Sequence, residues 1–203
     1  MIKYMNLCNT PSDINEHLPI LYRHARECET IIETGVRGVI SSYALTLGLC
    51  HNKSKQKKIL LNDIQECNIQ ELLRYTSGLD ISIEHKWCNN LELDINEKYD
   101  MIFIDTWHIY GQLKRELNKF SKYINKYIIM HDTTIDGTFG ESFRFKNRVN
   151  PKQQSIDSGI PLNEILIGLW PAIEEFLKNN NEWKLKHRYT NNNGLTILEK
   201  ITI

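Results

Sequence analysis

Five short apolar segments, each the length of a β-strand, alternate with segments of helical periodicity as far as residue 132. The segment YDMIFIDT is apolar almost without interruption, which is typical of a strand buried on both faces. Parallel strands need a crossover between them, and that crossover is usually a helix. The alternation therefore predicts a doubly wound, mostly parallel, Rossmann-like α/β sheet. The predicted strands are 30–35, 57–63, 79–86, 99–106 and 126–132, and the predicted helices between them are 39–50, 68–78 and 110–124.

The two ends of the chain extend this pattern. Residues 1–29 are predicted to form an N-terminal helical segment, in which Asp13 caps an amphipathic helix. A later helix over 163–180 is expected to kink or restart at Pro171. The last segment, 182–200, contains an Asn-rich turn and predicts an antiparallel C-terminal hairpin, which brings the sheet to seven strands. We expect residues 1–203 to form one domain.

Charge and cysteine content exclude several classes of protein. Lys and Arg balance Asp and Glu, 25 against 25, which argues against nucleic-acid and membrane-surface partners. The five cysteines form no CxxC pair, and their odd number is typical of reduced thiols. The polar N-terminus does not resemble a signal peptide, and no apolar run is long enough to span a bilayer. We therefore expect a soluble, cytoplasmic protein.

Acidic residues stand at the ends of four predicted strands. They are Glu33, Asp63, Asp105 and Asp132. The carboxyl ends of parallel strands meet at one edge of the sheet, where doubly wound folds bind their ligands. We therefore expect these carboxylates to converge on a single ligand-binding edge.

The turn after the first strand, within IIETGVRGVISS, helps to identify the ligand. It lacks the GxGxxG pattern of dinucleotide sites, and Glu33 would repel a pyrophosphate. An acid there suits a cationic ligand such as S-adenosylmethionine, and Gly35 would let that ligand approach the backbone. Alternatively, Glu33 is an ordinary strand-end acid and the glycines only form a turn. Asp63 can accept the hydroxyls of a ribose, as in NAD enzymes too, or it can cap the next helix.

The ends of the fourth and fifth strands supply a second group of polar residues. Adjacent strands lie about 4.8 Å apart, so Asp105 can meet His131 and Asp132 and hold a divalent cation with them. His108 lies three residues beyond Asp105 and could accept a hydroxyl proton. Alternatively, His108 is a helix cap or a surface residue, and His131 and Asp132 form a hydrogen-bonded strand end.

Three segments, IIETGVRGVISS, FIDTWHIYGQLKREL and IIMHDT, together resemble class I S-adenosylmethionine-dependent methyltransferases. The similarity is greatest to the cephalosporin-hydroxylase-like or macrocin-O-methyltransferase-like branch. The chain departs from that branch at Val39, where many members have glycine, at Thr106-Trp107, where many have Gly-Asp, and at His131, where an acid is frequent.

The resemblance implies roles for the residues already singled out. Glu33 and Gly35 would flank the methionine moiety of S-adenosylmethionine, and Asp63 would bind its ribose. Asp105, His131 and Asp132 would lie at an acceptor site supported by Mg²⁺ or Mn²⁺, and the catalytic residues would be His108, His131 and Asp132. The remaining residues assigned to the cofactor site are Arg37, Gly38, Ser41 and Asp105.

The polar stretch 133–161 has the composition of a lid-like insertion. Its aromatic residues, Phe139, Phe143 and Phe145, could cover a ring of the acceptor, and Gly137 and Gly140 could act as hinges. Its basic residues, Arg144, Lys146 and Arg148, could bind an acidic group. Alternatively, the stretch is a surface loop with incidental charge.

These features predict a metal-assisted O-methyltransferase that acts on a hydroxyl of a sugar, a glycan or a small molecule. Two alternatives remain: a catalytically silent S-adenosylmethionine-binding scaffold and an NAD-dependent oxidoreductase. The chain lacks a basic stripe and an Asn-Pro-Pro-aromatic segment, which argues against a nucleic-acid methyltransferase. The oligomeric state stays open, with a homodimer among the options.

Overall fold

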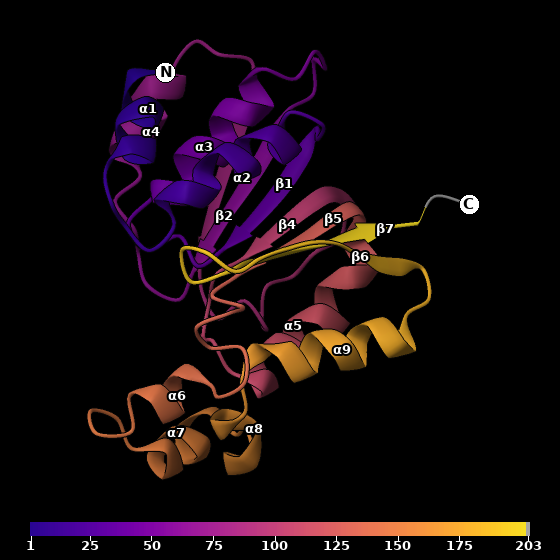
Figure 1. Ribbon diagram of the computed structural model, residues 1–203. Helices are drawn as coiled ribbons and strands as arrows, with labels where there is room; N and C mark the ends of the chain where they lie inside the picture. The colour runs from indigo at the N-terminus through magenta and orange to yellow at the C-terminus, as the bar shows by residue number, and fades with distance from the viewer. Residues whose placement is uncertain (202–203) are drawn as a thin grey trace.

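The computed structural model describes residues 1–201 and confirms the predicted fold class. A seven-stranded sheet crosses the molecule in the order β3-β2-β1-β4-β5-β7-β6 (Figure 1). Strands β1 to β5 pair in parallel, and β7 pairs antiparallel with both β5 and β6. The strands are β1 (Thr30–Thr34), β2 (Lys58–Asp63), β3 (Ser82–Trp87), β4 (Tyr99–Ile104), β5 (Ile124–His131), β6 (Trp183–Tyr189) and β7 (Leu195–Lys200).

The strand order reverses between β1 and β4. From β1 the chain runs outward through β2 to β3, and it then crosses back to place β4 on the other side of β1. Such a reversal opens a crevice outside the carboxyl ends of the two central strands, because the connections on either side lead away from it. The fold therefore places the ligand edge at the ends of β1, β4 and their neighbours.

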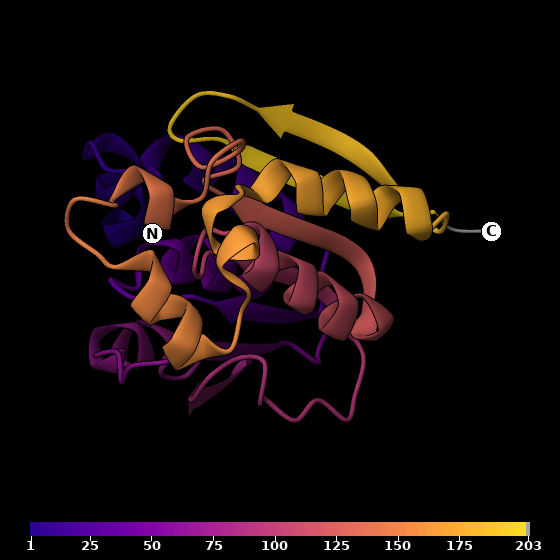
Figure 2. The same ribbon diagram turned by 90° about the horizontal axis from the view of Figure 1, so that it is seen from below.

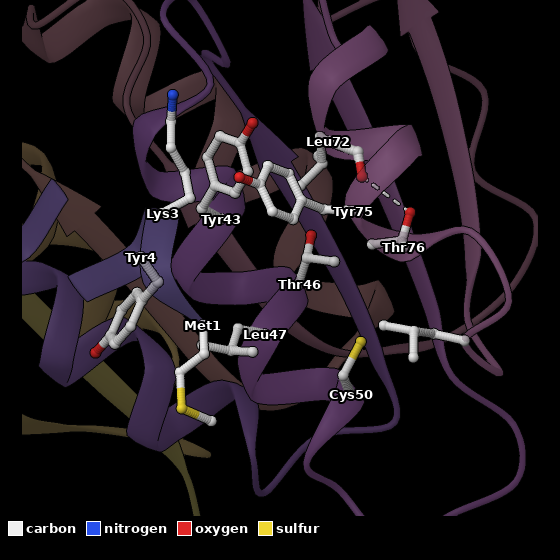
Figure 3. A pocket seen from close by; sticks show the side chains of 11 residues that line it. Met1, Lys3, Tyr4, Tyr43, Thr46, Leu47, Cys50, Leu72, Tyr75 and Thr76 are labelled. Atoms are coloured by element: carbon white, nitrogen blue, oxygen red, sulfur yellow. Dashed lines mark hydrogen bonds between the residues drawn. The ribbon is translucent and has the colours of Figure 1, made fainter. Parts of the chain in front are cut away.

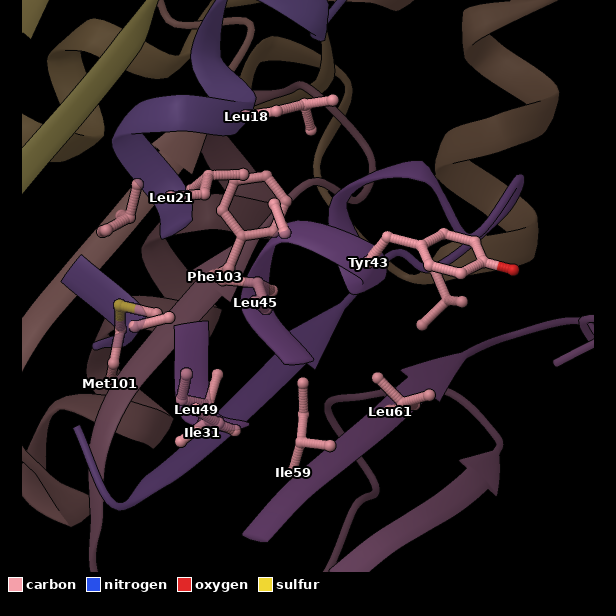
Figure 4. Packing of buried hydrophobic residues seen from close by; sticks show 14 of the residues in the cluster. Leu18, Leu21, Ile31, Tyr43, Leu45, Leu49, Ile59, Leu61, Met101 and Phe103 are labelled. Atoms are coloured by element: carbon pink, nitrogen blue, oxygen red, sulfur yellow. The ribbon is translucent and has the colours of Figure 1, made fainter. Parts of the chain in front are cut away.

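Helices cover both faces of the sheet (Figures 1 and 2). Alternate residues of β1 show the division: Ile31 packs with Leu21 on one face (Figure 4), whereas Ile32 packs with Leu113 and Ile173 on the other. None of the helices within residues 1–201 combines the length and the apolar character needed to cross a bilayer. The helices that precede β4 are α1 (Ile2–Asn9), η1 (Asn15–His17), α2 (Leu18–Ala25), α3 (Ile40–Cys50) and α4 (Gln70–Thr76). Those following it are α5 (Tyr110–Phe120), η2 (Ser121–Tyr123), α6 (Glu141–Arg144), α7 (Pro151–Ser158), α8 (Leu162–Leu166) and α9 (Leu169–Asn179).

The stretch 133–161 is more ordered than a polar loop. It contains α6 and α7, which pack against α8. The glycines expected to act as hinges, Gly137 and Gly140, are both closely packed. A Cβ on Gly140 would lie 2.8 Å from the carbonyl oxygen of Ile165, and one on Gly137 would lie 2.7 Å from that of Thr133. These positions are glycine because backbone segments meet there.

The predicted interruption at Pro171 is confirmed. Helix α8 ends at Leu166, and α9 starts at Leu169 with Pro171 in its first turn, where a missing N–H costs no hydrogen bond. The expected capping role of Asp13 is wrong. Its carboxylate instead lies 2.6 Å from the guanidinium of Arg37, and this ion pair joins the N-terminal segment to the turn after β1.

That turn is held against the end of β4 by backbone contacts. Gly35 adopts a φ of +89° and donates its N–H to the carbonyl of Asn62 at 2.9 Å, while Asp105 donates its N–H to Thr34, also at 2.9 Å. A Cβ on Gly35 would overlap the carbonyl of Asp105. The fold itself therefore requires glycine here, before any ligand is considered.

We predict that Gly35→Ala lowers the free energy of unfolding by roughly 2–4 kcal/mol, because the new Cβ displaces the Asp105 backbone and strains a positive φ. Gly38→Ala is the matched control. The nearest atom to a Cβ there is 3.8 Å away, on Ile40, and we expect a change below about 1 kcal/mol. Urea unfolding followed by circular dichroism measures both. Equal stability of the two variants would contradict the close approach of Gly35 to Asp105.

Candidate active site

The structure places Glu33, Asp63, Asp105 and Asp132 at the carboxyl ends of β1, β2, β4 and β5, as predicted. Register pairing aligns Thr34 with both Asn62 and Ile104, and Ile104 with Met130. Asp105 and Asp132 share one cluster with His108 and His131. Glu33 and Asp63 lie apart from that cluster, at the turn after β1. The edge therefore carries two neighbouring groups of polar residues.

His108 is at the centre of the first group. Its Nε2 lies 3.1 Å from Oδ1 of Asp105, and its Nδ1 lies 3.1 Å from Oδ2 of Asp132, 2.9 Å from Glu141 and 3.4 Å from Asp136. Burial opposes a charge on this imidazole, but the surrounding carboxylates outweigh burial and raise the pKa of His108 well above its ordinary value. The surrounding carboxylates therefore favour the protonated, cationic form of His108.

His131 faces the same carboxylates from the end of β5. Its Nδ1 lies 3.5 Å from Oδ1 of Asp105 and 3.6 Å from Oδ2 of Asp132. Burial lowers the pKa of His131, but the two carboxylates raise it to about 9. The pKa of Asp105 is held below its usual range, because hydrogen bonds from both histidines outweigh the effect of burial. Protons on the imidazoles therefore balance the carboxylate charge.

The donor atoms of this group fit a divalent cation. One ligand atom each from Asp105, His131 and Asp132 lies within 4.8 Å of the others, and Oδ1 of Asp132 is buried without a hydrogen-bond partner. Carboxylate oxygens suit Mg²⁺ and Mn²⁺, and imidazole nitrogen is a ligand of transition-metal ions. His108, Asp132 and Asp136 form a second such group.

Sequence reasoning missed Asp136 and Glu141 as partners of His108. Asp136 is fully buried, and Arg144 binds it through two hydrogen bonds, from Nε at 2.7 Å and from Nη2 at 2.6 Å. The guanidinium expected to meet an acidic acceptor is therefore paired with Asp136 of the protein itself. Asp136 precedes a glycine and has the appearance of an ordinary turn residue, so no spacing in the sequence marks it.

Glu33 lies beneath the turn after β1 rather than at its surface. Its carboxyl is fully buried, Oε1 accepts a hydrogen bond from the hydroxyl of Ser41, and Oε2 has no partner. Burial raises the pKa of Glu33 to about 7, although the hydrogen bond from Ser41 opposes this shift. An unpartnered buried carboxyl directly under a glycine turn leaves one acceptor atom for a group bound there.

Asp63 ties this turn to the end of β2. Its Oδ2 accepts the N–H of Arg37 at 2.9 Å, and its Oδ1 accepts the N–H of Gln65 at 3.0 Å. A Cβ at Gly38, in the same turn, would meet only Ile40, at van der Waals distance. Ile64 follows Asp63 and is 74% exposed. The sequence analysis did not name Ile64 as a candidate site residue, although the sequence shows an apolar residue directly after the strand-end acid Asp63.

Two cavities lie away from these groups. One is lined by Asn68, Glu71, Arg74 and Tyr75. The other, of about 90 Å³, lies between α1, α3 and α4 and is lined mainly by apolar and aromatic side chains (Figure 3). Neither cavity includes a residue of the strand-end groups.

Comparison with known proteins assigns the fold. No family model and no curated protein sequence matches the chain. Among solved structures, similar chains include a Staphylococcus aureus protein described as a caffeoyl-CoA O-methyltransferase, with a TM-score of 0.61, 18% identity, and coverage of 92% of this chain and 83% of that one. The chain has the fold of class I methyltransferases.

Two further solved structures of similar fold differ in the atom that accepts the methyl group. An O-methyltransferase from Bacillus cereus in complex with S-adenosylhomocysteine has a TM-score of 0.59 at 14% identity, and the match covers 92% of this chain and 81% of that one. The N-methyltransferase NodS from Bradyrhizobium japonicum has a TM-score of 0.60 at 12% identity, with 94% and 97% covered. Both oxygen and nitrogen acceptors therefore occur among chains of this fold.

The buried carboxyl of Glu33 makes stability depend on pH. Its pKa is raised from about 4.5 to about 7 in the folded state. The stabilising contribution of Glu33 to the free energy of unfolding is therefore fully present below pH 4.5. It is lost as the pH rises through 7, by at most about 1.4 kcal/mol per pH unit. Glu33→Gln removes this loss, so we predict that the variant gains stability relative to the wild type between pH 5 and 8.

Urea unfolding at several pH values measures the effect. Glu66→Gln, at an exposed site, is the control and should keep the wild-type pH dependence. An unchanged pH dependence in Glu33→Gln would show that Glu33 is ionised in the folded protein at neutral pH.

Proposed function

We propose that this protein is an S-adenosylmethionine-dependent methyltransferase that uses a divalent cation to methylate a hydroxyl group. The observation that carries the proposal is the meeting of Asp105, His131 and Asp132 at the ligand edge of a methyltransferase fold, directly beside His108. The resemblance of the sequence motifs supports a sugar, glycan or small-molecule acceptor.

In this proposal Asp105, His131 and Asp132 hold Mg²⁺ or Mn²⁺. A cation there would lower the pKa of an acceptor hydroxyl and offset the carboxylate charge that keeps His108 protonated. His108, once neutral, accepts the hydroxyl proton as the oxygen–methyl bond forms and the sulfur–methyl bond breaks. Asp136 and Glu141 contact Nδ1 of His108 and fix the orientation of its ring.

The turn after β1 would receive the methyl donor. Asp63 retains lone pairs beyond its two backbone contacts and would accept a ribose hydroxyl. The exposed side chain of Ile64 would lie against the base, and Gly38 leaves space for the chain of the ligand. Arg37 would act through its backbone, since its guanidinium pairs with Asp13. Ser41 would act through Glu33, to which its hydroxyl donates.

The charge of the cluster argues against a silent scaffold. Burying several carboxylates and two imidazoles beside one another costs free energy that a well-packed apolar core avoids. A protein that only binds the cofactor has no need of this arrangement, which is separate from the turn after β1. Such groups are typical of sites where protons and charge move during a reaction.

We predict that S-adenosylhomocysteine raises the melting temperature and binds with a dissociation constant in the micromolar range, because the ligand binds only the folded state. Calorimetry with S-adenosylhomocysteine and with NAD, each with and without Mg²⁺, measures this directly. Binding of NAD, with no response to millimolar S-adenosylhomocysteine, would exclude the methyltransferase class and favour an oxidoreductase.

We predict that Asp132→Asn lowers methyl transfer by about 10²-fold or more, because the change removes one carboxylate charge from the cation site. Binding of S-adenosylhomocysteine should be almost unchanged, and EDTA should inhibit the wild type until Mg²⁺ or Mn²⁺ is restored. Asp80→Asn, at an exposed position, is the control. Turnover that survives both chelation and Asp132→Asn would exclude the metal and leave a histidine as the sole base.

A further inference from the structure

An exposed apolar platform, made of Phe139, Phe143 and Ile167, lies close to the acidic cluster. Phe139 is 57% exposed, and its ring stacks on that of Phe143, with 4.8 Å between centroids and 24° between planes. Phe139 also pairs with Ile167 in an isolated antiparallel bridge, and Ile167 is 37% exposed. Residues directly opposite each other in such a bridge project to the same face. Contiguous apolar side chains at the surface are typical of binding sites, and the proposed reaction does not yet use these three.

Backbone contacts fix the platform beside His108. Glu141, the first residue of α6, donates its N–H to the carbonyl of His108 at 2.9 Å, and its carboxylate lies 2.9 Å from Nδ1 of the same histidine. Gly140, between Phe139 and Glu141, donates its N–H to the carbonyl of Leu166 at 3.1 Å. Helices α6, α7 and α8 pack together as a small group beside the sheet (Figure 1). The platform therefore begins two residues from the contact with His108.

Two cations follow the platform along the chain, and both are exposed. The ammonium of Lys146 lies 4.4 Å from the centroid of the Phe143 ring, and Arg148 follows two residues later. Within residues 1–201, neither Lys146 nor Arg148 forms an ion pair with a carboxylate, whereas Arg144 is bound to Asp136. Lys146 and Arg148 therefore keep a positive charge that is available to an anion from solution.

Phe145 keeps the second cation near the first. The guanidinium of Arg148 lies 5.8 Å from the centroid of the Phe145 ring, and the N–H of Arg148 donates to the carbonyl of Phe145 at 2.7 Å. A guanidinium over an aromatic ring is attracted to the face of that ring. One short segment thus carries an apolar ring surface at one end and two available cations at the other.

We propose that this segment binds the acceptor, and that the acceptor is a ring compound with an anionic group in addition to the hydroxyl that receives the methyl. The apolar face of its ring would lie on Phe139, its phosphate or carboxylate would lie at Lys146 and Arg148, and its hydroxyl would point towards His108. The inference rests on the proposed function, since it places the acceptor at the cluster around His108. It assigns the chemical class of that acceptor.

The size of this surface favours a small molecule over a lipid surface or a second copy of the chain. Helix α6 spans only Glu141–Arg144, whereas a helix that lies on a membrane needs a long apolar face. A stable protein interface buries roughly 800 Å² on each partner. An aromatic side chain buries at most about 250 Å², so three partly exposed side chains supply too little area.

Five probes test the requirement for an anionic group. Phenyl phosphate, benzoate and glucuronate are the anionic probes, and phenol and glucose are their neutral counterparts. Saturation-transfer difference NMR measures the dissociation constants, with and without S-adenosylhomocysteine. We expect each anionic probe to bind at least about 5-fold more tightly than its counterpart, and salt to reduce this preference. Phenyl phosphate against benzoate distinguishes phosphate from carboxylate, and benzoate against glucuronate distinguishes an aromatic ring from a sugar.

Two variants separate the contribution of the ring from that of the charge. Lys146→Gln combined with Arg148→Gln should remove the preference for anionic probes, because both cations are lost and the platform stays. Phe139→Leu should weaken anionic and neutral probes alike, by about 3-fold or more, and should keep the preference, because only the ring face is lost. Lys55→Gln, at an exposed lysine before β2, is the control and should match the wild type.

Equal binding of anionic and neutral probes, or binding of none of them, would overturn the proposal. A preference that survives in the double variant would overturn it too, because the anion would then bind elsewhere. Sedimentation velocity supplies a third check: a dimer that becomes a monomer in Phe139→Leu would show that a second copy covers the ring, against the proposal.

The binding of S-adenosylhomocysteine keeps this test separate from the proposed function. If S-adenosylhomocysteine binds and the probes show no preference, only the acceptor class is wrong. If the probes show the preference and S-adenosylhomocysteine does not bind, the site for an anionic ring compound is supported and the methyltransferase proposal fails.

Discussion

The contact between the backbone of Gly35 and the carbonyl of Asp105 joins the two halves of the site. It fixes the turn after β1, where the proposed methyl donor would bind, against the end of β4, where the acidic cluster begins. Methyl transfer requires the sulfur, the methyl carbon and the acceptor oxygen to lie in line, and a small misplacement is costly. A backbone contact with no side chain between the two groups is the most direct way to fix that geometry.

Around this contact the protein keeps opposite charges in balance. Four carboxylates surround His108, which is protonated as a result, while His131 balances Asp105 and Asp132, and Arg144 balances Asp136. Burial disfavours the charge on Asp105 and Asp136, but the cations that face these two carboxyls lower the pKa of both. In the proposed function, a divalent ion would replace imidazole protons within the same balance of charge.

Much of the fold and part of the site follow from the sequence. Strand periodicity predicts β1 to β5, and strand-end position alone brings Asp105, His131 and Asp132 together, because parallel neighbours end at the same edge. Asp136 and Glu141 could not be found this way. They come from turns and short helices whose path depends on close packing at Gly140 and Gly194 and on the hairpin turn, not on any periodic pattern. The sequence also places Glu33 at a strand end but does not show that its carboxyl is fully buried there.

The most direct test of this account is a crystal structure of the protein with S-adenosylhomocysteine and Mn²⁺, measured so that the anomalous scattering locates the metal. The account predicts an anomalous peak bound by Asp105, His131 and Asp132, with the ligand lying over the turn from Gly35 to Gly38 and its ribose at Asp63. Ligand at that turn without a metal peak at the three residues, or with a peak bound elsewhere, would contradict the metal-assisted mechanism. Failure of the ligand to occupy the turn would contradict the assignment of methyl transfer itself.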